Sequence, residues 1–397
     1  MVNHYPKDWR IVLLSELSIE GFQNGLFYEV ARKNKGIPII NVGDLYKSSP
    51  IANDKLELFN ATAEEIKRYQ VFNGDLFFTR SSIVPSGIAF CNWYRCSEKK
   101  AVVFDSHVVR FKTNTDVVNP MYLYLACIRP DARKYFLANA KTATMTTIDQ
   151  TVLGRCPIPY PALKEQTAIA EAVSDADNLI FSLQKLIEKK KAIKQGTMQE
   201  LLTGKKRLPG FSGKRKRKKL GNYIKFEVGF PFKSQYFNSQ HIGLRLIKNR
   251  DLKSDDQVYY TTEDVSSEYI VNNGDVLVGM DGDFTPCIWR KGVALLNQRG
   301  RIGAFGMDLL FSYYLLQQPL QELQIGTGAT TVKHLSHFDV EELELTFPEE
   351  IKEQQAIAQA LSDMDNDIEQ LEKKLSKYQQ IKQGMMQDLL TGRIRLV

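Results

Sequence analysis

A segment of roughly 45 residues occurs twice in this sequence. Residues 164–208 read KEQTAIAEAVSDADNLIFSLQKLIEKKKAIKQGTMQELLTGKKRL, and residues 352–396 read KEQQAIAQALSDMDNDIEQLEKKLSKYQQIKQGMMQDLLTGRIRL. The copies align without a gap at an offset of 188 residues, and about 27 positions are identical. Repeated sequence predicts repeated structure, so this duplication constrains the fold before any local pattern does. The chain therefore reads as two halves that end in the same segment.

Both copies have the hydrophobic spacing of a coiled-coil helix. Their apolar residues recur at alternating intervals of four and three. A helix of ~40 residues extends ~60 Å, so it must bury its apolar stripe on another helix, and the repeat is the obvious partner. If a two-fold axis relates the halves, the helices run antiparallel. The residues predicted to pack in this coiled coil are Ile169, Val173, Ile180, Leu183 and Ile187, with Ile357, Leu361, Met364, Ile368, Leu371 and Leu375.

The stretches around these helices predict two globular domains of mixed α and β structure. Short apolar runs such as IVLLSEL and DLFFTR, bounded by Gly, Pro, Asn and Asp, are typical of strands, and brief helical patches interrupt them. This irregular order indicates an α+β fold. The predicted boundaries are a first domain at 1–160, a first long helix at 161–204, a basic linker at 205–219, a second domain at 220–348 and a second long helix at 349–392.

The second domain repeats short motifs of the first. LIKNRDL resembles IINVGDL, and YIVNNGDVLVGM resembles YQVFNGDLFFTR. Each match is weak by itself. Together they predict two homologous domains whose loops have diverged.

The composition argues against several classes of protein. No run of ~18 apolar residues is present for a membrane span, and the first residues lack the profile of a signal peptide, so the cytoplasm is the expected location. The five cysteines form no C-x-x-C ligand cluster and are expected to be reduced and mostly buried. His334 and His337 lack the partners that would complete a metal site.

The formal charge of +7 is unevenly distributed. It is about +5 for residues 1–160, +9 for 161–219, −5 for 220–348 and −2 for the remainder. A basic balance suggests contact with a polyanion, but in the acidic second domain any nucleic-acid surface must be a local patch. The run from Lys214 to Lys219 has two readings, a solvated linker or a contact with DNA phosphates.

This layout resembles the specificity subunit of Type I restriction-modification systems. The resemblance rests on PALKEQ at 161–166, on KQGTMQELLTGKKRLPGF at 194–211, and on the second copy of the same signature between 353 and 396. It implies two target-recognition domains, each reading one half of a split DNA sequence, with antiparallel helices that fix the gap. It further implies two docked methyltransferase (M) subunits and restriction (R) subunits that complete the nuclease. One departure is that Asp8-Trp9 begins the first half, whereas the second half has a basic run at 213–219.

No catalytic chemistry of the chain's own is predicted. Asn119-Pro120-Met121-Tyr122 resembles the N-P-P-Y motif of amino-methyltransferases but lacks its second Pro, and no Gly-rich loop follows a strand to hold S-adenosylmethionine. Asn119 instead predicts a helix start. Since no phosphate-binding P-loop and no serine nucleophile elbow occur, we expect no cofactor.

The candidate DNA-reading residues lie in loops of both domains. Arg suits guanine O6 and N7, Gln suits adenine, Asp accepts from cytosine N4, and Ser and Thr bind phosphates or bases. In the first domain these residues are Arg80, Ser81, Ser82, Lys141, Thr142 and Thr144. In the second they are Lys248, Arg250, Asp281, Asp283, Gln298, Arg299, Arg301 and Lys333.

Three kinds of function remain open at this stage. The favoured hypothesis is a non-catalytic DNA-specificity subunit that binds double-stranded DNA and M subunits through its major-groove readers and its coiled coil. The alternatives are a free-standing two-domain DNA-binding regulator and a pure coiled-coil scaffold. The isolated chain is also a possible homodimer, formed through the surface that otherwise receives its partners.

Overall fold

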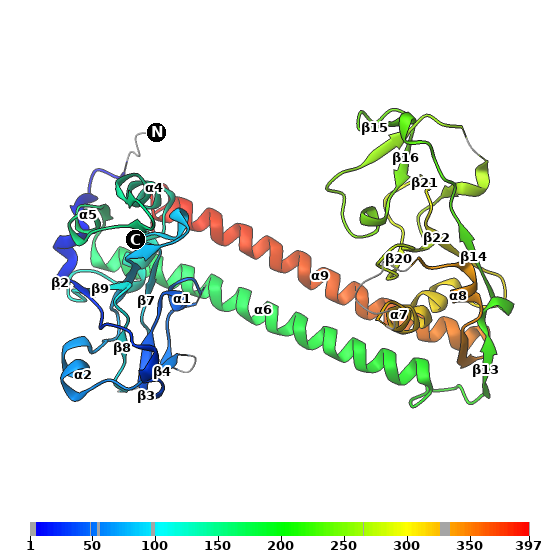
Figure 1. Ribbon diagram of the computed structural model, residues 1–397, viewed down its shortest axis with the longest axis horizontal. Coiled ribbons are helices and arrows are strands. Elements are labelled where there is room, and N and C mark those ends of the chain that lie inside the picture. Colours follow the sequence, from blue (N-terminus) through cyan, green and yellow to red (C-terminus); the bar gives the residue numbers. More distant parts are fainter. Residues whose placement is uncertain are drawn as a thin grey trace. The chain divides into compact units, whose positions relative to one another are not determined.

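The computed structural model describes residues 5–47, 49–53, 56–96, 100–264, 266–325 and 334–396. It divides into two compact units, Met1–Leu183 with Lys374–Val397 (unit 1) and Gln184–Lys373 (unit 2). Each unit holds one globular domain and parts of two long helices, α6 (Leu163–Thr203) and α9 (Ile351–Leu389) (Figure 1). Among the described residues, no helix is long and apolar enough to cross a membrane. The mixed α and β structure agrees with the predicted fold class.

The first domain consists of short strands followed by short helices. Its strands are β1 (Arg10–Leu13), β2 (Ser18–Asn24), β3 (Lys33–Ile40), β4 (Glu57–Phe59), β5 (Leu76–Thr79), β6 (Ser81–Ser82), β7 (Cys91–Trp93), β8 (Val103–Phe104), β9 (Val108–Thr113), β10 (Lys141–Thr142), β11 (Thr146–Thr147) and β12 (Pro157–Tyr160). Its helices are α1 (Val42–Leu45), α2 (Ala63–Tyr69), α3 (Pro120–Cys127), α4 (Pro130–Asn139) and α5 (Gln150–Gly154). Asn119 is the N-cap of α3, where its side chain accepts hydrogen bonds from two backbone amides, so its predicted role as a helix start is confirmed.

The second domain has the same kind of elements. Its strands are β13 (Arg215–Lys219), β14 (Ile224–Val228), β15 (Phe237–Asn238), β16 (Leu244–Ile247), β17 (Tyr259–Thr261), β18 (Ile270–Val271), β19 (Val276–Val278), β20 (Pro286–Ile288), β21 (Ala294–Leu296), β22 (Gly300–Ala304) and β23 (Glu344–Pro348). Its helices are α7 (Leu309–Ile325) and α8 (His337–Glu341).

The sheets show that the two domains share one topology. The sheet β2-β9-β5-β7 of the first domain corresponds to β14-β22-β19-β20 of the second. Likewise, β4-β3-β8 corresponds to β17-β16-β21, and in each of these sheets a parallel pair, β3 with β8 or β16 with β21, joins strands far apart in sequence. The pair β1-β12 corresponds to β13-β23. The weak sequence matches between the halves therefore mark equivalent structure.

The matching motifs form the same turn in both domains. Asp75 accepts a hydrogen bond from the backbone amide of Phe72 at 2.9 Å, and Asp275 accepts one from Asn272 at 2.9 Å. The glycine before each aspartate has a positive φ, 92° and 101° respectively, which glycine adopts without strain. The G-D motif is thus a structural device that begins β5 and β19. It also gives a register for the strand that follows: residues 75–81 of the first domain correspond to residues 275–281 of the second.

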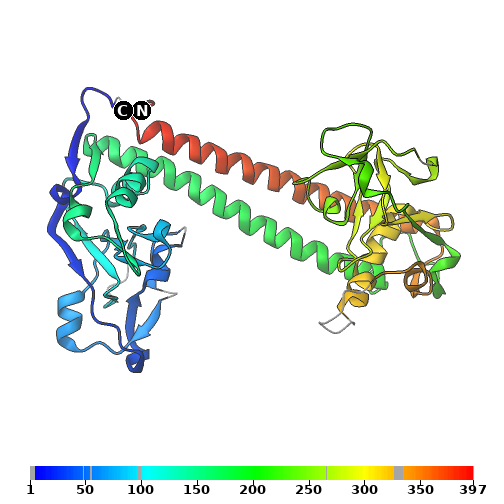
Figure 2. The same cartoon turned by 45° about the horizontal axis from the view of Figure 1, so that its top comes forward.

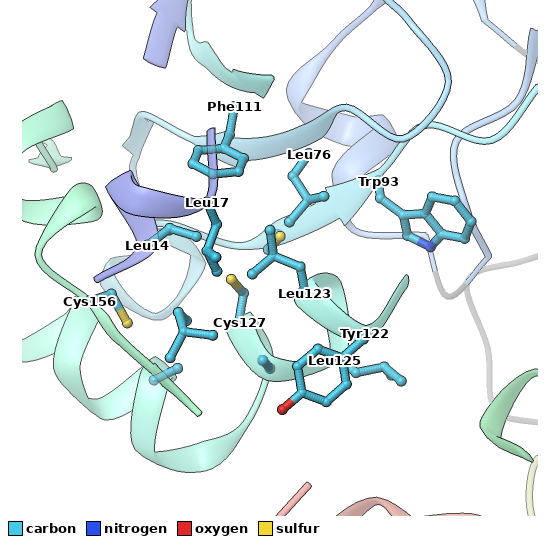
Figure 3. Packing of buried hydrophobic residues seen from close by; sticks show 14 of the residues in the cluster. Leu14, Leu17, Leu76, Trp93, Phe111, Tyr122, Leu123, Leu125, Cys127 and Cys156 are labelled. Atoms are coloured by element: carbon cyan, nitrogen blue, oxygen red, sulfur yellow. The ribbon is translucent and has the colours of Figure 1, made fainter. Parts of the chain in front are cut away.

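Each domain packs its sheet against helices around its own core. Figure 3 shows Leu76 and Phe111 of the four-stranded sheet converging on Leu14, Leu17 and Leu123, and all five side chains are buried. The corresponding cluster of the second domain joins β19 and β22 to α7. Because burial of apolar side chains is the main favourable contribution to folding, each domain has its own source of stability.

The long helices extend into both cores. In unit 1, Ile169 and Val173 of α6 belong to the same cluster as Leu389 of α9. In unit 2, Leu201 of α6 belongs to the same cluster as Leu361 of α9. Of the residues predicted to pack, Ile169, Val173, Leu183, Ile187, Ile357, Leu361 and Ile368 are buried, and Ile180, Met364, Leu371 and Leu375 are half-buried.

Ion pairs give the direction of the helices within each unit. In unit 1, Asp177 pairs with Lys382. In unit 2, Lys190 pairs with Asp367 at 3.1 Å and Lys194 with Asp365 at 2.5 Å. As the numbers rise along α6 they fall along α9. The two helices are therefore antiparallel where they meet in unit 2, and Figures 1 and 2 show them side by side there.

The repeated K-E-Q triplet has a structural role at the start of each helix. The Gln166 side chain accepts a hydrogen bond from the backbone amide of Asn119 and donates one to the carbonyl oxygen of Pro161, both at 2.9 Å. Gln354 makes the same two bonds, with Asp308 and Pro348, at 2.9 Å. This glutamine therefore fastens each long helix to the globular domain that precedes it.

The glutamate of the triplet is a buried acceptor in both units. Glu165 is 1 % exposed and binds the indole Nε1 of Trp9 at 3.1 Å and the guanidinium of Arg395. Glu353 is also 1 % exposed and binds Arg207 at 2.6 Å and Arg215 at 3.1 Å. Arg207 and Arg395 are themselves equivalent positions of the two copies. We call each of these sets, Glu165 with its two donors and Glu353 with its two donors, a clamp. Each repeat thus supplies the glutamate of one clamp and an arginine of the other.

Part of the predicted linker is wrong, because residues 215–219 form β13. This strand pairs with β23 across its whole length, from Arg215 with Pro348 to Lys219 with Glu344. Carboxylates neutralise its charges: Arg217 pairs with Glu344 at 3.0 Å, and other pairs involve Glu342, Glu349 and Glu353. The sequence did not reveal this strand because its acidic partners lie more than 120 residues away. Arg215 donates to Glu353 in the clamp of unit 2, as Trp9 donates to Glu165 in the clamp of unit 1.

We expect Arg215→Ala to lower the free energy of unfolding by about 3 kcal/mol, because it leaves the buried Glu353 carboxylate with one arginine instead of two. The matched control is Lys216→Ala, which removes an exposed charge 3.7 Å from Glu349 in the same strand and should cost less than about 0.5 kcal/mol. Urea unfolding of the two variants measures both values. Equal effects would show that the clamp does not stabilise this junction.

Candidate nucleic-acid interface

A small sheet brings the predicted reading loops of the first domain together. In β10-β11-β6, Ser81 pairs with Thr147 and Ser82 with Thr146, while Lys141 and Thr142 pair with the same two threonines from the other side. Two segments about 60 residues apart in sequence therefore lie one strand apart. Thr144 is exposed in the turn between β10 and β11.

A hollow of about 690 Å³, lined mainly by polar residues, lies beside this sheet. Its lining residues are Asn24, Arg80, Ser81, His107, Asn139, Lys141, Met145, Thr147, Ile148, Asp149 and Gln150. Ser81 Oγ is 2.7 Å from His107 Nδ1, and Gln150 Nε2 donates to Asn24 Oδ1 at 3.0 Å. Lys141 is 83 % exposed, and its ammonium is 3.8 Å from Asp149. The hydrogen bonds of Ser81 with His107 and of Gln150 with Asn24 fix these four side chains relative to one another.

Sequence reasoning missed several polar groups of this hollow. Asn24 ends β2, Asn139 ends α4, Gln150 begins α5 and His107 precedes β9. Each is a single polar residue at the end of an element, and such residues occur at many surface positions. Only the meeting of four chain segments distinguishes these from the rest.

The second domain has different side chains at the equivalent place. By the register of the shared turn, Asp281 corresponds to Ser81, and its bridge to His334 corresponds to the pairing of β6 with β11. The Asp281 carboxylate accepts from Arg299 at 2.7 Å and is 2.8 Å from His334 Nδ1. The hydrogen bonds from His334 and Arg299 hold the pKa of Asp281 below its usual range. Asp281 is therefore an ionised group with both oxygens engaged.

The other predicted residues of the second domain do not form one cluster with Asp281. Arg301 binds Glu227 at 2.7 Å and the carbonyl oxygens of Ile270 and Glu268, so it joins parts of the fold. The Lys248 ammonium lies 3.2 Å from the centre of the Tyr259 ring, and burial lowers the pKa of Lys248. Their companions are placed as follows: Arg250 is exposed, Asp283 pairs with Lys253, Gln298 is exposed with a φ of 47°, and Lys333 lies outside the described residues.

The thiols and the acidic groups differ from the hollow in their surroundings. Burial raises the pKa of Cys127, Cys156 and Cys287, so these thiols stay protonated in apolar surroundings. Within the residues that the structure describes, no group of three or more His, Cys, Asp or Glu is placed to hold a metal ion. The hollow beside β6, β10 and β11 offers hydrogen-bonding side chains to a ligand.

Comparison with known proteins places this frame among DNA-specificity domains. A family model described as the Type I restriction modification DNA specificity domain matches twice, at residues 6–195 and 213–383. The putative Type I restriction enzyme MjaX specificity subunit of Methanocaldococcus jannaschii is 25 % identical over 419 residues, covering 100 % of this chain and 96 % of that protein. The EcoBI specificity subunit of Escherichia coli is 34 % identical over 174 residues, 42 % of this chain and 36 % of that protein.

Solved structures show the same fold. The crystal structure of a Type I restriction-modification S subunit from M. genitalium has a TM-score of 0.61 at 14 % identity, covering 98 % of this chain and 96 % of that one. A chain from a structure of the Type I system, reported for its complex assembly and conformational transition, has a TM-score of 0.55 at 13 % identity and covers 98 % of this chain and 100 % of that one. At such low identity these likenesses concern the fold.

Proposed function

Because the chain belongs to the Type I restriction-modification DNA specificity family, we propose that each of its domains reads one half of a bipartite DNA target through the major groove. The chain is the non-catalytic specificity subunit of such a system. In this proposal the antiparallel helices set the gap between the half-sites and dock two M subunits, and R subunits join that complex to cleave DNA. The complex meets its DNA in the cytoplasm.

One observation carries the proposal of two independent readers. The two domains keep the same strand order, the same aspartate turn and the same helix attachment, yet differ in the side chains at equivalent surface positions. Ser81 with His107 in the first domain stands where Asp281 with Arg299 and His334 stands in the second. Hydroxyl, imidazole, carboxylate and guanidinium groups present different donor and acceptor patterns to base edges. Two domains of the same fold with different surface side chains fit a target whose halves have unrelated sequences.

The test is to map methylated bases in cells that carry the whole system. We expect a split, asymmetric motif with a gap of fixed length, absent from cells in which this chain alone is deleted. A contiguous motif, or methylation that persists without the chain, would contradict the proposal. Tight sequence-specific binding by the isolated chain, combined with unchanged methylation on its deletion, would instead support the free-standing regulator.

A further inference from the structure

The loop that follows β6 in the first domain exposes two large apolar side chains. Ile83 is 83 % exposed and Val84 is 61 % exposed, directly after Ser81 and Ser82. They line a second hollow of about 660 Å³, whose surface is mostly apolar and includes Tyr46 and Phe90. Ser81, His107 and Met145 line both hollows, so the two hollows adjoin.

This exposure is built into the loop. Ser82 Oγ donates to the carbonyl oxygen of Val84 at 2.7 Å, and the turn Pro85–Gly87 follows at once. Arg133 donates to the carbonyl oxygens of Ser86 at 2.8 Å, Ile88 at 2.8 Å and Ala89 at 2.7 Å. Tyr46 donates to Gly87 at 3.0 Å. With hydrogen bonds on both sides of the tip, the two side chains are held towards solvent.

The second domain lacks this apolar tip. In the second domain, Asp283 and Phe284 lie in the corresponding connection, between β19 and β20. Asp283 pairs with Lys253, and Phe284 is fully buried. The connection is also shorter, since residues 279–285 join β19 to β20 whereas residues 80–90 join β5 to β7. The apolar tip is thus a feature of one half only.

This asymmetry limits what the tip can contact. A protein that docks in the same way on each half of a repeated chain would meet the same surface twice. The two DNA half-sites are what differ between the halves. In the major groove the apolar group that distinguishes one base pair from another is the C5-methyl of thymine.

We propose that Ile83 and Val84 contact thymine methyl groups of the half-site read by the first domain. This inference rests on the proposed function and deepens it, because it assigns at least one A·T pair to that half-site. Arg80 and Lys141 on the adjoining hollow then face phosphates or polar base edges beside the methyl groups.

Substitution of deoxyuridine for thymidine tests the contact, since it removes the methyl group and keeps every hydrogen-bonding group of the base. The full chain, in its methyltransferase complex, is titrated with duplexes carrying one such substitution at each thymine of the mapped target. Wild type should bind about fourfold more weakly for each contacted methyl of the first half-site. The double variant Ile83→Ser, Val84→Ser should bind the unmodified target more weakly and no longer distinguish thymine from uracil there.

A matched control is Ile19→Ser, which removes a side chain that is 59 % exposed on β2 and lines neither hollow, and it should retain the wild-type response. Wild type that binds every uracil duplex of the first half-site as tightly as the thymine duplex overturns the proposal. A first half-site without an A·T pair also overturns the proposal. A double variant that binds DNA normally but no longer binds the methyltransferase subunits overturns it as well, because the tip would then contact a protein. If wild type shows no sequence-specific binding, the proposed function fails and the inference fails with it.

Discussion

Exchanging the first globular domain, residues 1–160, for that of a relative with another target should replace one half of the methylated motif and leave the other half and the gap unchanged. The expected effect is all-or-none: methylation of the original motif falls to background, and a hybrid motif is methylated instead. The physical reason is that each domain buries its own core, and the proposed reading loops lie on each domain separately. The hydrogen bonds of the Asp281 side chain that the structure describes are with Arg299 and His334, both of the second domain.

The exchange must preserve the attachment to α6. Trp9 donates to Glu165, and the backbone amide of Asn119 donates to Gln166, so the donor domain has to supply an equivalent indole and helix start. A donor domain without the indole would leave the buried Glu165 with Arg395 as its partner. Methylation could then be lost because the chain misfolds and not because recognition changes. The reciprocal exchange of residues 220–348 is the control and should alter the other half alone. If one exchange changed both halves, the domains would not read independently.

Much of the fold was predictable because duplication and hydrophobic period are local signals. The alternation of four and three apolar intervals predicted both long helices, which run from Leu163 to Thr203 and from Ile351 to Leu389. The strand β13 was not predictable in the same way. Five consecutive basic residues have no apolar alternation, and the strand pairs with β23, whose carboxylates lie opposite its basic side chains.

The candidate interface was predictable by residue type but not by arrangement. The sequence predicts Arg80 and Lys141 as polar residues in loops, and the pairing of β6 and β10 with β11 puts them on one hollow. In the second domain the same reasoning grouped Arg299 with Arg301. The structure separates them, because Arg299 binds Asp281 whereas Arg301 binds Glu227. Sequence alone does not distinguish an arginine that contacts bases from an arginine that pairs with a carboxylate, because both uses favour this residue.

Removing one heptad from each long helix should shorten the gap of the methylated motif by about three base pairs. Seven residues at a rise of 1.5 Å correspond to ~10 Å of helix, and one base pair occupies ~3.4 Å of DNA. Residues 184–190 of α6 and 368–374 of α9 are the matched pair to delete, because Lys190 faces Asp367 in the antiparallel arrangement. A whole heptad keeps the apolar seam in register, so the helices should still pack.

The reading loops lie outside these deletions, so both half-sites should keep their sequences while the gap changes. Deleting the heptad from α6 alone is the control: it shifts the rest of α6 by one heptad against α9 and separates Lys194 from Asp365, and methylation should be lost. Sequencing methylated bases in cells distinguishes the results. A paired deletion that stays active with the original gap would show that the helices do not set the spacing. A new half-site sequence would mean that helix length alters base recognition itself, because the loops that carry the readers are identical in both proteins.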